Sequence, residues 1–198
     1  MLRTVLTIHH IFAFQCFNFP ARHSKAGEKS DAVLGHNVSL FQAATGITMK
    51  VAIVCGSVYG SAEEVARHAA TLLQASGHDT LVNPRLALPD LLAFEPQALL
   101  AVTSTTGMGE LPDNLMPLYS QLRDLLPAAL RGLPGGVIAL GDASYGDTFC
   151  AGGEQMRELF AELGIVEVQD MLRLDGSESV TPETDAEPWL ATFMTRLG

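Results

Sequence analysis

The feature that most constrains this 198-residue chain is a strand, a loop and a helix that follow one another directly after Met49. The apolar run Val51 to Cys55 is typical of a strand buried on both faces. Gly56 to Ser61 contains glycines and hydroxyls, which favours a tight turn. Ser61 is placed to cap the helix that the next apolar residues predict. Together these parts predict an anion site, because backbone N–H groups and the helix dipole favour negative charge there.

The first loop, Gly56–Ala62, has no basic side chain. A P-loop would offer a Gly-Lys-Ser/Thr sequence whose lysine reaches the outer phosphates, and that sequence is absent. The dinucleotide fingerprint Gly-x-Gly-x-x-Gly is absent too. Neutral donors alone indicate a single phosphate monoester rather than a polyphosphate.

From Met49 onward, strand-like and helix-like segments alternate, which predicts a parallel sheet with helices on both faces. The expected strands are 51–55, 80–82, 98–103, 136–140 and 166–174. Ligands of such sheets bind at the carboxyl ends of the strands, at the topological switch point. Three loops of unusual composition follow strands, and we expect them to meet at one edge: Gly56–Ala62, Ser104–Asp113 and Gly141–Cys150.

The second and third loops suit a flat ligand. Two glycines, Gly107 and Gly109, allow bare backbone to approach a ring in the second loop. Tyr145 and Phe149 stand among small residues in the third loop, where an aromatic side chain can stack on a planar ring. The alternatives are a mobile loop before a helix and an aromatic side chain that packs on its own loop.

Charge and cysteine content narrow the class of protein. Residues 1–48 hold four basic and two acidic residues, which is a net charge of +2. The whole chain has a formal net charge of −10, so the remaining residues carry −12. Such an acidic body excludes nucleic acid and anionic membranes as partners and favours a basic protein partner, although solubility alone explains it equally well. Three sparse cysteines without metal-like spacing indicate reduced thiols and a cytoplasmic protein.

Residues 1–48 do not share the pattern of the rest. No apolar run reaches the roughly 20 residues of a membrane span, and paired histidines interrupt the apolar part of any secretory signal. We interpret 1–48 as a poorly ordered extension or as sequence before a natural start at Met49, with a weak targeting segment as the lesser alternative. Residues 49–198 form the predicted domain, which we expect to be a monomer.

Taken together, the three loops resemble the flavodoxin family, above all its short-chain bacterial members of the YqcA and MioC type, and the FMN domains of diflavin reductases. The resemblance covers Met49 to the C-terminus. It implies a flavodoxin-like doubly wound sheet of order 2-1-3-4-5 that binds FMN without a covalent bond.

The resemblance also implies residue roles. The FMN phosphate would be held by Ser57, Val58, Tyr59, Gly60, Ser61 and Ala62. One side of the flavin ring would be lined by Thr105, Thr106, Gly107 and Gly109. The other side would be lined by Leu140, Gly141, Asp142, Tyr145, Phe149 and Cys150, with Tyr145 stacked on the ring. Asp175 falls where diflavin reductases keep an acidic residue near the flavin.

Three positions depart from the family pattern. Tyr59 replaces a small hydroxyl residue and so rearranges one phosphate donor. Thr106 replaces an aromatic residue of several relatives, which leaves the flavin stacked on one face only. The segment from Tyr145 to Phe149 is one residue longer than in some relatives, which puts the roles of Phe149 and Cys150 in question. Cys150 is more simply a packed thiol than a redox group.

The function that the resemblance implies is a low-potential carrier of single electrons between a flavodoxin or ferredoxin reductase and acceptor enzymes. Acidic residues near the ring would oppose a second negative charge on it. The Gly107 peptide would turn its carbonyl toward N5 of the one-electron-reduced ring. The alternatives are an FMN-dependent NAD(P)H or quinone oxidoreductase and a regulatory module without flavin. A phospho-acceptor domain is excluded, because the acidic residues it needs after the first and third strands are absent.

Overall fold

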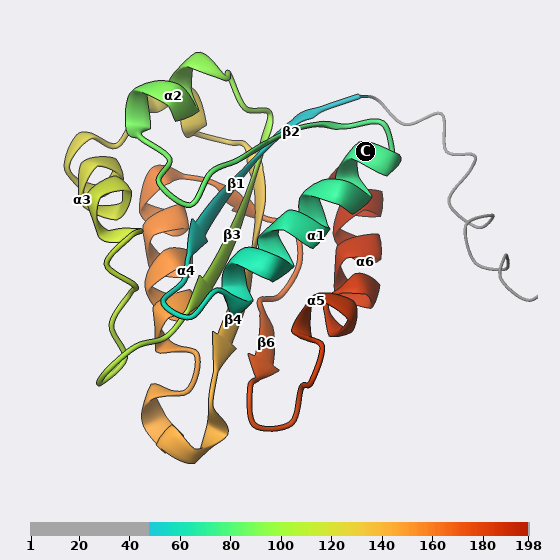
Figure 1. Ribbon diagram of the computed structural model, residues 1–198. Helices are drawn as coiled ribbons and strands as arrows, with labels where there is room; N and C mark the ends of the chain where they lie inside the picture. The colour runs from blue at the N-terminus through green and yellow to red at the C-terminus, as the bar shows by residue number, and fades with distance from the viewer. Residues whose placement is uncertain (1–47, 198) are drawn as a thin grey trace, which may run out of the picture. The chain divides into compact units, whose positions relative to one another are not determined.

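The computed structural model describes residues 48–197, and the structural statements below concern that part of the chain (Figure 1). The interpretation of residues 1–48 therefore lies, except for Thr48, outside the described residues. The strands are β1 (Lys50–Gly56), β2 (Asp79–Val82), β3 (Ala98–Ser104), β4 (Pro134–Gly141), β5 (Val166–Glu167) and β6 (Leu172–Asp175). The α-helices are α1 (Ser61–Ala75), α2 (Leu88–Ala93), α3 (Met116–Leu125), α4 (Ala151–Leu163), α5 (Pro182–Asp185) and α6 (Glu187–Leu197). Two 3₁₀ helices, η1 (Ala128–Leu130) and η2 (Ala143–Thr148), complete the list.

All pairings in the sheet are parallel, and the strand order is β2-β1-β3-β4-β5, with β6 also paired to β4. This order confirms the predicted doubly wound sheet. The order reverses between β1 and β3, because β2 lies on one side of β1 and every later strand lies on the other. Loops that leave β1 and β3 must therefore diverge to opposite faces and open a crevice between them.

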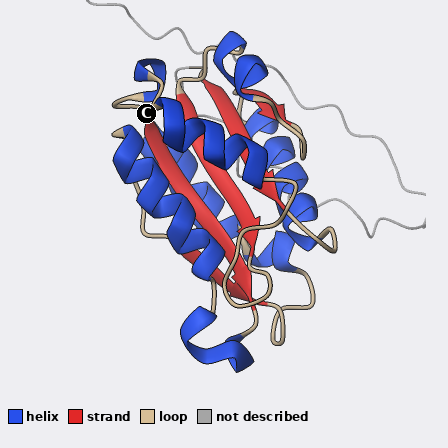
Figure 2. Ribbon diagram, turned by 90° about the vertical axis from the view of Figure 1, so that its left-hand side faces the viewer, coloured by secondary structure: helices blue, strands red, loops and turns tan. Residues whose placement is uncertain are grey.

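Helices cover both faces of the sheet, as Figure 2 shows. Side chains alternate along a strand, so each central strand feeds two separate cores. Ala52 and Val54 of β1 belong to the core that also contains buried side chains of α2, α3 and α4. Val51 and Ile53 of the same strand belong to the core under α1 and α6. A strand buried on both faces in this way explains the unbroken apolar runs in the sequence.

The prediction of one continuous strand over residues 166–174 is wrong for the middle of that segment. Residues 168–171 leave the ladder and separate β5 from β6. Side chains of α6 take up backbone carbonyls there: Trp189 Nε1 donates to the carbonyl of Asp170 at 2.8 Å, and Arg196 Nη1 donates to that of Val168 at 2.6 Å. These bonds satisfy two of the four carbonyls in this segment, and no local sequence pattern indicates them.

The predicted helix cap at Ser61 is also wrong. Ser61 is the first residue of α1, and the cap position belongs to Gly60, whose φ of 99° is left-handed. No side chain caps this helix, so its first N–H groups stay available to a ligand. Within residues 48–197, no helix has both the length and the hydropathy that crossing a membrane requires.

Candidate functional site

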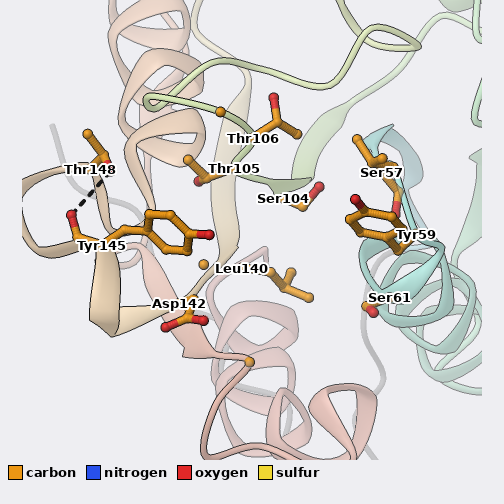
Figure 3. Close-up of a pocket in the computed structure, with 14 residues that line it drawn as sticks. Ser57, Tyr59, Ser61, Ser104, Thr105, Thr106, Leu140, Asp142, Tyr145 and Thr148 are labelled. Atoms are coloured by element: carbon orange, nitrogen blue, oxygen red, sulfur yellow. Dashed lines mark hydrogen bonds between the residues drawn. The ribbon is translucent and has the colours of Figure 1, made fainter.

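A cavity of about 500 Å³ lies at the carboxyl ends of β1, β3 and β4. Its volume falls in the roughly 300–1,000 Å³ range of small-molecule sites. Figure 3 shows side chains of all three loops around it, with Tyr59 and Tyr145 on opposite sides. The lining consists of Ser57, Val58, Tyr59, Ser61, Ser104, Thr105, Thr106, Gly107, Leu140, Gly141, Asp142, Tyr145, Thr148 and Gly176. The predicted convergence of the three loops is thus present in the fold.

The first loop is held from beneath by Asn114, which comes from the segment after β3. Its Oδ1 accepts a hydrogen bond from the Ser57 N–H at 3.0 Å. Its Nδ2 donates to the carbonyls of Cys55, at 3.3 Å, and Pro84, at 2.8 Å. Ser57 Oγ in turn accepts from the Gly60 N–H at 3.0 Å. Bonds from Asn114 and within the loop therefore hold its shape without a ligand, a condition for a preorganised anion site.

Ser104 is a lining residue that the sequence prediction missed. Its Oγ is buried and has no hydrogen-bond partner within the described chain. An unpaired buried hydroxyl costs roughly 1–3 kcal/mol, so such a group normally has a partner when the site is filled. Ser104 lies at the end of β3, across the crevice from Ser57 and Ser61 in Figure 3. Its place at a strand end, before the glycine loop, was the signal that was available.

The donors around the cavity fit the phosphate and the polar chain of FMN. Ser57, Ser61 and Ser104 bring three hydroxyls, and the uncapped N-terminus of α1 adds backbone N–H groups. Among the lining residues none is basic. Neutral donors at a helix N-terminus are sufficient for one phosphate group.

The second loop is a closed turn at one wall of the cavity. Thr106 and Glu110 exchange backbone hydrogen bonds of 2.9 and 2.8 Å. The Glu110 carboxylate bends back and accepts from the Met108 N–H at 2.5 Å. Gly107 has a left-handed φ of 54°, and a Cβ at this position would overlap the Glu110 carboxylate. A side chain at 107 would thus be strained by the backbone angle and would have to push the flexible Glu110 carboxylate aside.

The third loop forms η2, with Tyr145 65% exposed at the cavity. Asp142 begins it, and Asp142 Oδ1 accepts from the Ser144 N–H at 2.8 Å. Thr148, a second lining residue that the prediction missed, donates from Oγ1 to the Tyr145 carbonyl at 3.3 Å (Figure 3). An exposed aromatic ring on a tied loop is suited to stack on a flat ligand.

Some residues predicted for the site do not line the cavity: Gly60, Ala62, Gly109, Phe149 and Cys150. Ala62 is buried in the core under α1, and Phe149 packs on the core of the other face. The Gly109 carbonyl accepts from Gln155 Nε2 of α4 at 2.7 Å. These residues shape the loops from behind, which a motif carried over along the sequence cannot distinguish from direct lining. Gly176, which follows β6, is the third lining residue that the prediction missed.

Cys150 is fully buried, and its Sγ lies 3.6 Å from the Ala139 carbonyl oxygen. Burial raises the pKa of the Cys150 thiol to about 11 and that of the Cys55 thiol to about 12. Both thiols are free and protonated at neutral pH. Cys150 is therefore a packed thiol at the start of α4, as the sequence suggested.

Comparison with known proteins agrees with this geometry. The family model described as flavodoxin matches residues 53–189. Flavodoxin YqcA of Escherichia coli strain K12 is 40% identical over 148 residues, which are 75% of this chain and 98% of that protein. Protein MioC of the same strain is 32% identical over 147 residues, which are 74% of this chain and 97% of that protein.

A solved structure extends the agreement to three dimensions. It is that of a cysteine-to-alanine mutant of flavodoxin from Pseudomonas aeruginosa, 69% identical, with a TM-score of 0.73. The match covers 75% of this chain and 99% of that one. The sheet order, the cavity between three loops and these relatives lead to one conclusion: the chain belongs to the flavodoxin family.

Proposed function

We propose that this protein binds FMN in the cavity and carries single electrons at low potential between a reductase and acceptor enzymes. The observation that carries the proposal is the cavity itself, whose lining combines neutral donors at a helix N-terminus with a tyrosine at the far side. When bound, the flavin supplies the electron-accepting chemistry, and the protein supplies binding, orientation and electrostatics.

Each end of the cavity has its own task in this proposal. Ser57, Ser61 and the N–H groups at the start of α1 bind the phosphate, and Ser104 finds in the cofactor the partner that its buried hydroxyl lacks. Thr106 and Gly107 would line one side of the ring. Tyr145 would cover the other side and keep water from it.

Acidic side chains near the cavity determine whether the reduction potential of a bound flavin is raised or lowered. Glu110, Asp113 and Asp147 are exposed, and Asp142 is half-buried in the lining. Their negative charge opposes further negative charge in the cavity, which makes the second one-electron reduction harder than it is in water. A low second potential suits a carrier that delivers one electron at a time.

The first experiment asks whether the purified protein is yellow and releases one FMN per chain on denaturation. A binding series with FMN, riboflavin and FAD then tests the phosphate end. We expect FMN to bind tightest, because the site offers donors for one phosphate. A colourless protein that takes up no FMN would refute the proposal and favour a module without flavin.

Reduction assays separate a carrier from an oxidoreductase. Reduction of the FMN-loaded protein by NADPH should require an added flavodoxin reductase. Rapid reduction by NADPH alone, followed by turnover of a quinone, would instead show the NAD(P)H or quinone oxidoreductase that the sequence left as the alternative.

The partners proposed are a basic-surfaced reductase and acceptor redox enzymes. They dock on the acidic rim of the cavity, which we define as Glu110, Asp113, Asp142 and Asp147. Tyr59, Met108 and Tyr145 are 97%, 82% and 65% exposed there, so the rim encloses apolar surface. Electrostatic steering raises the association rate, and salt screens it. Electron transfer to the protein from such a reductase should therefore slow several-fold between low and high salt.

A matched pair of variants locates the docking surface. Asp147→Asn removes a charge beside the cavity, whereas Asp124→Asn removes one near the end of α3, at the opposite edge of the sheet. We expect the first variant to weaken the salt dependence and the second to leave it unchanged. Equal effects, or rates that do not respond to salt, would contradict docking on the rim.

We also propose that the protein works as a monomer in the cytoplasm, where the free thiols Cys55 and Cys150 stay reduced. Size-exclusion chromatography at several protein concentrations tests the monomeric state.

A further inference from the structure

Asp175 is the last residue of β6 and is paired in register with Gly141 of β4. Its Oδ1 accepts three hydrogen bonds: from the Ala143 N–H at 3.2 Å, the Ser177 N–H at 3.0 Å and the Ser177 Oγ at 2.8 Å. Ala143 belongs to the loop after β4, and Ser177 belongs to the loop after β6. A single carboxylate oxygen therefore connects two loops that are far apart in the sequence.

A backbone bond reinforces this connection. The Gly176 N–H donates to the Gly141 carbonyl at 2.7 Å, and both glycines line the cavity. The pKa of the Asp175 carboxyl lies below its ordinary value of 3.8, above all because the Ser177 N–H and hydroxyl donate to it. The carboxylate is thus ionised at neutral pH and keeps its acceptor role there.

The loop that Asp175 reaches is the one that carries Tyr145. Residues 143–147 are all exposed, so packing contributes little to their position. Figure 2 shows the short helix η2 beneath the sheet, apart from the longer helices. Hydrogen bonds from Ser144 to Asp142 and from Ala143 to Asp175 tie the start of this segment to the ends of β4 and β6. Phe149, which packs on the core, anchors its other end.

We propose that Asp175 is a positioning residue that holds the Tyr145 loop against the cavity, and that it acts through the hydrogen bonds of Oδ1 rather than through its charge. The proposal rests on the proposed function, because the loop is held in place for the flavin ring. It differs from what the family resemblance implied for Asp175, which was an acidic group acting on the flavin.

Two substitutions separate geometry from charge. Asp175→Asn keeps an Oδ1 acceptor and removes the charge, while Asp175→Ala removes all three hydrogen bonds. We expect Asp175→Ala to weaken FMN and riboflavin by the same factor, about tenfold, because the loss lies at the ring end. Asp175→Asn should stay within about threefold of the original protein. Glu178→Gln, which removes an exposed charge three residues away, serves as the control and should change nothing.

A double substitution tests whether the effect passes through Tyr145. Tyrosine stacked on a flavin quenches its fluorescence, so Asp175→Ala should restore part of the emission of the bound cofactor. In a Tyr145→Ala background, Asp175→Ala should have no further effect on affinity or emission. Additive effects would overturn the proposal. So would an Asp175→Asn protein that behaves like Asp175→Ala, or a loss restricted to FMN.

Amide hydrogen exchange on the protein without cofactor tests the connection separately from flavin binding. The Ala143 N–H should exchange at least several-fold faster in Asp175→Ala than in the original protein or in Asp175→Asn. If the protein bound no flavin, the proposed function would fail while this measurement still reported on the loop. Unchanged exchange in Asp175→Ala would refute the role of Asp175 even in a protein that binds FMN.

Discussion

Substitution of Gly107 by alanine tests the second loop most directly, because this glycine meets two independent constraints. Its φ of 54° is left-handed, and the space for a Cβ is filled by the Glu110 carboxylate. An alanine must therefore tolerate the left-handed angle and also displace the carboxylate. Displacement breaks the 2.5 Å hydrogen bond from the Met108 N–H to Glu110.

The magnitude follows from these two costs. A left-handed alanine costs roughly 1 kcal/mol relative to glycine. The bond from Met108 to an exposed carboxylate contributes about 1 kcal/mol, at the low end for charged acceptors because water competes for both groups. Their sum of about 2 kcal/mol corresponds to roughly a thirtyfold weaker affinity for FMN, if the cofactor binds the loop in the conformation seen here.

A double-mutant cycle separates the two costs. Glu110→Ala alone loses only the hydrogen bond and should weaken FMN about fivefold. The double variant should resemble Gly107→Ala at roughly thirtyfold, because the carboxylate that the alanine displaces is already gone. Titration of the cofactor-free protein with FMN, followed by flavin fluorescence, measures all four affinities. A redox titration of the same proteins gives the separation of the two reduction potentials.

Two results would refute this reasoning. If the double variant bound FMN as weakly as the product of the single effects, about 150-fold, the carboxylate would not compete with the Cβ. If Gly107→Ala bound FMN normally and left both potentials unchanged, the loop would not take part in holding or tuning the flavin.

Three further substitutions or conditions give measurable outcomes. Ser104→Ala should weaken FMN about fivefold yet leave the cofactor-free protein as stable as before or up to about 1 kcal/mol more stable, since its buried hydroxyl has no partner among residues 48–197; chemical denaturation and FMN titration measure the two effects. Cys55 and Cys150 should resist alkylation at pH 8 in the folded protein and react after denaturation, as peptide mass mapping would show, because burial raises both pKa values. Burial lowers the pKa of His78, so the folded state favours the neutral ring; this stability should be full above about pH 6.5 and decline below it, and the decline should be smaller in His78→Gln.

The sheet was predictable from the sequence because its central strands are buried on both faces. Such strands read as unbroken apolar runs, and β1, β3 and β4 are those runs. The interruption at residues 168–171 was not predictable, since it depends on Trp189 and Arg196 reaching across from α6. Contacts between segments that are distant in the sequence leave no local periodicity to recognise.

For the site, too, features with a local sequence pattern were predictable, and features that depend on contacts between distant segments were not. The composition of the first loop predicted an anion site, and the glycines of the second loop predicted a place for a flat ligand. The individual lining residues, such as Thr105 to Gly107, were predicted only from the family resemblance. Ser104 and Thr148 lie in loops that were predicted to meet at this edge, but each looks like an ordinary strand-end or loop residue, and only the fold shows that both line the cavity. Ser61 was assigned as a cap because its type and position suit one, but the left-handed Gly60 turns the chain so that the helix starts one residue earlier.

The uncharged donors at the start of α1 (Ser57, Ser61 and backbone N–H groups) and the acidic residues near the cavity (Glu110, Asp113, Asp142 and Asp147) act together electrostatically. A lysine at the phosphate would add affinity but would also place a positive charge in a cavity that is surrounded by carboxylates. Backbone N–H groups and hydroxyls bind a phosphate as dipoles, and dipole fields fall off faster with distance than the field of a charge. Arg67, Arg157 and Arg173 each pair with glutamates, which offsets their positive charge. Under the proposed function, such donors would hold the phosphate locally while the field at the ring stayed negative, so the charge that opposes a second electron would be preserved.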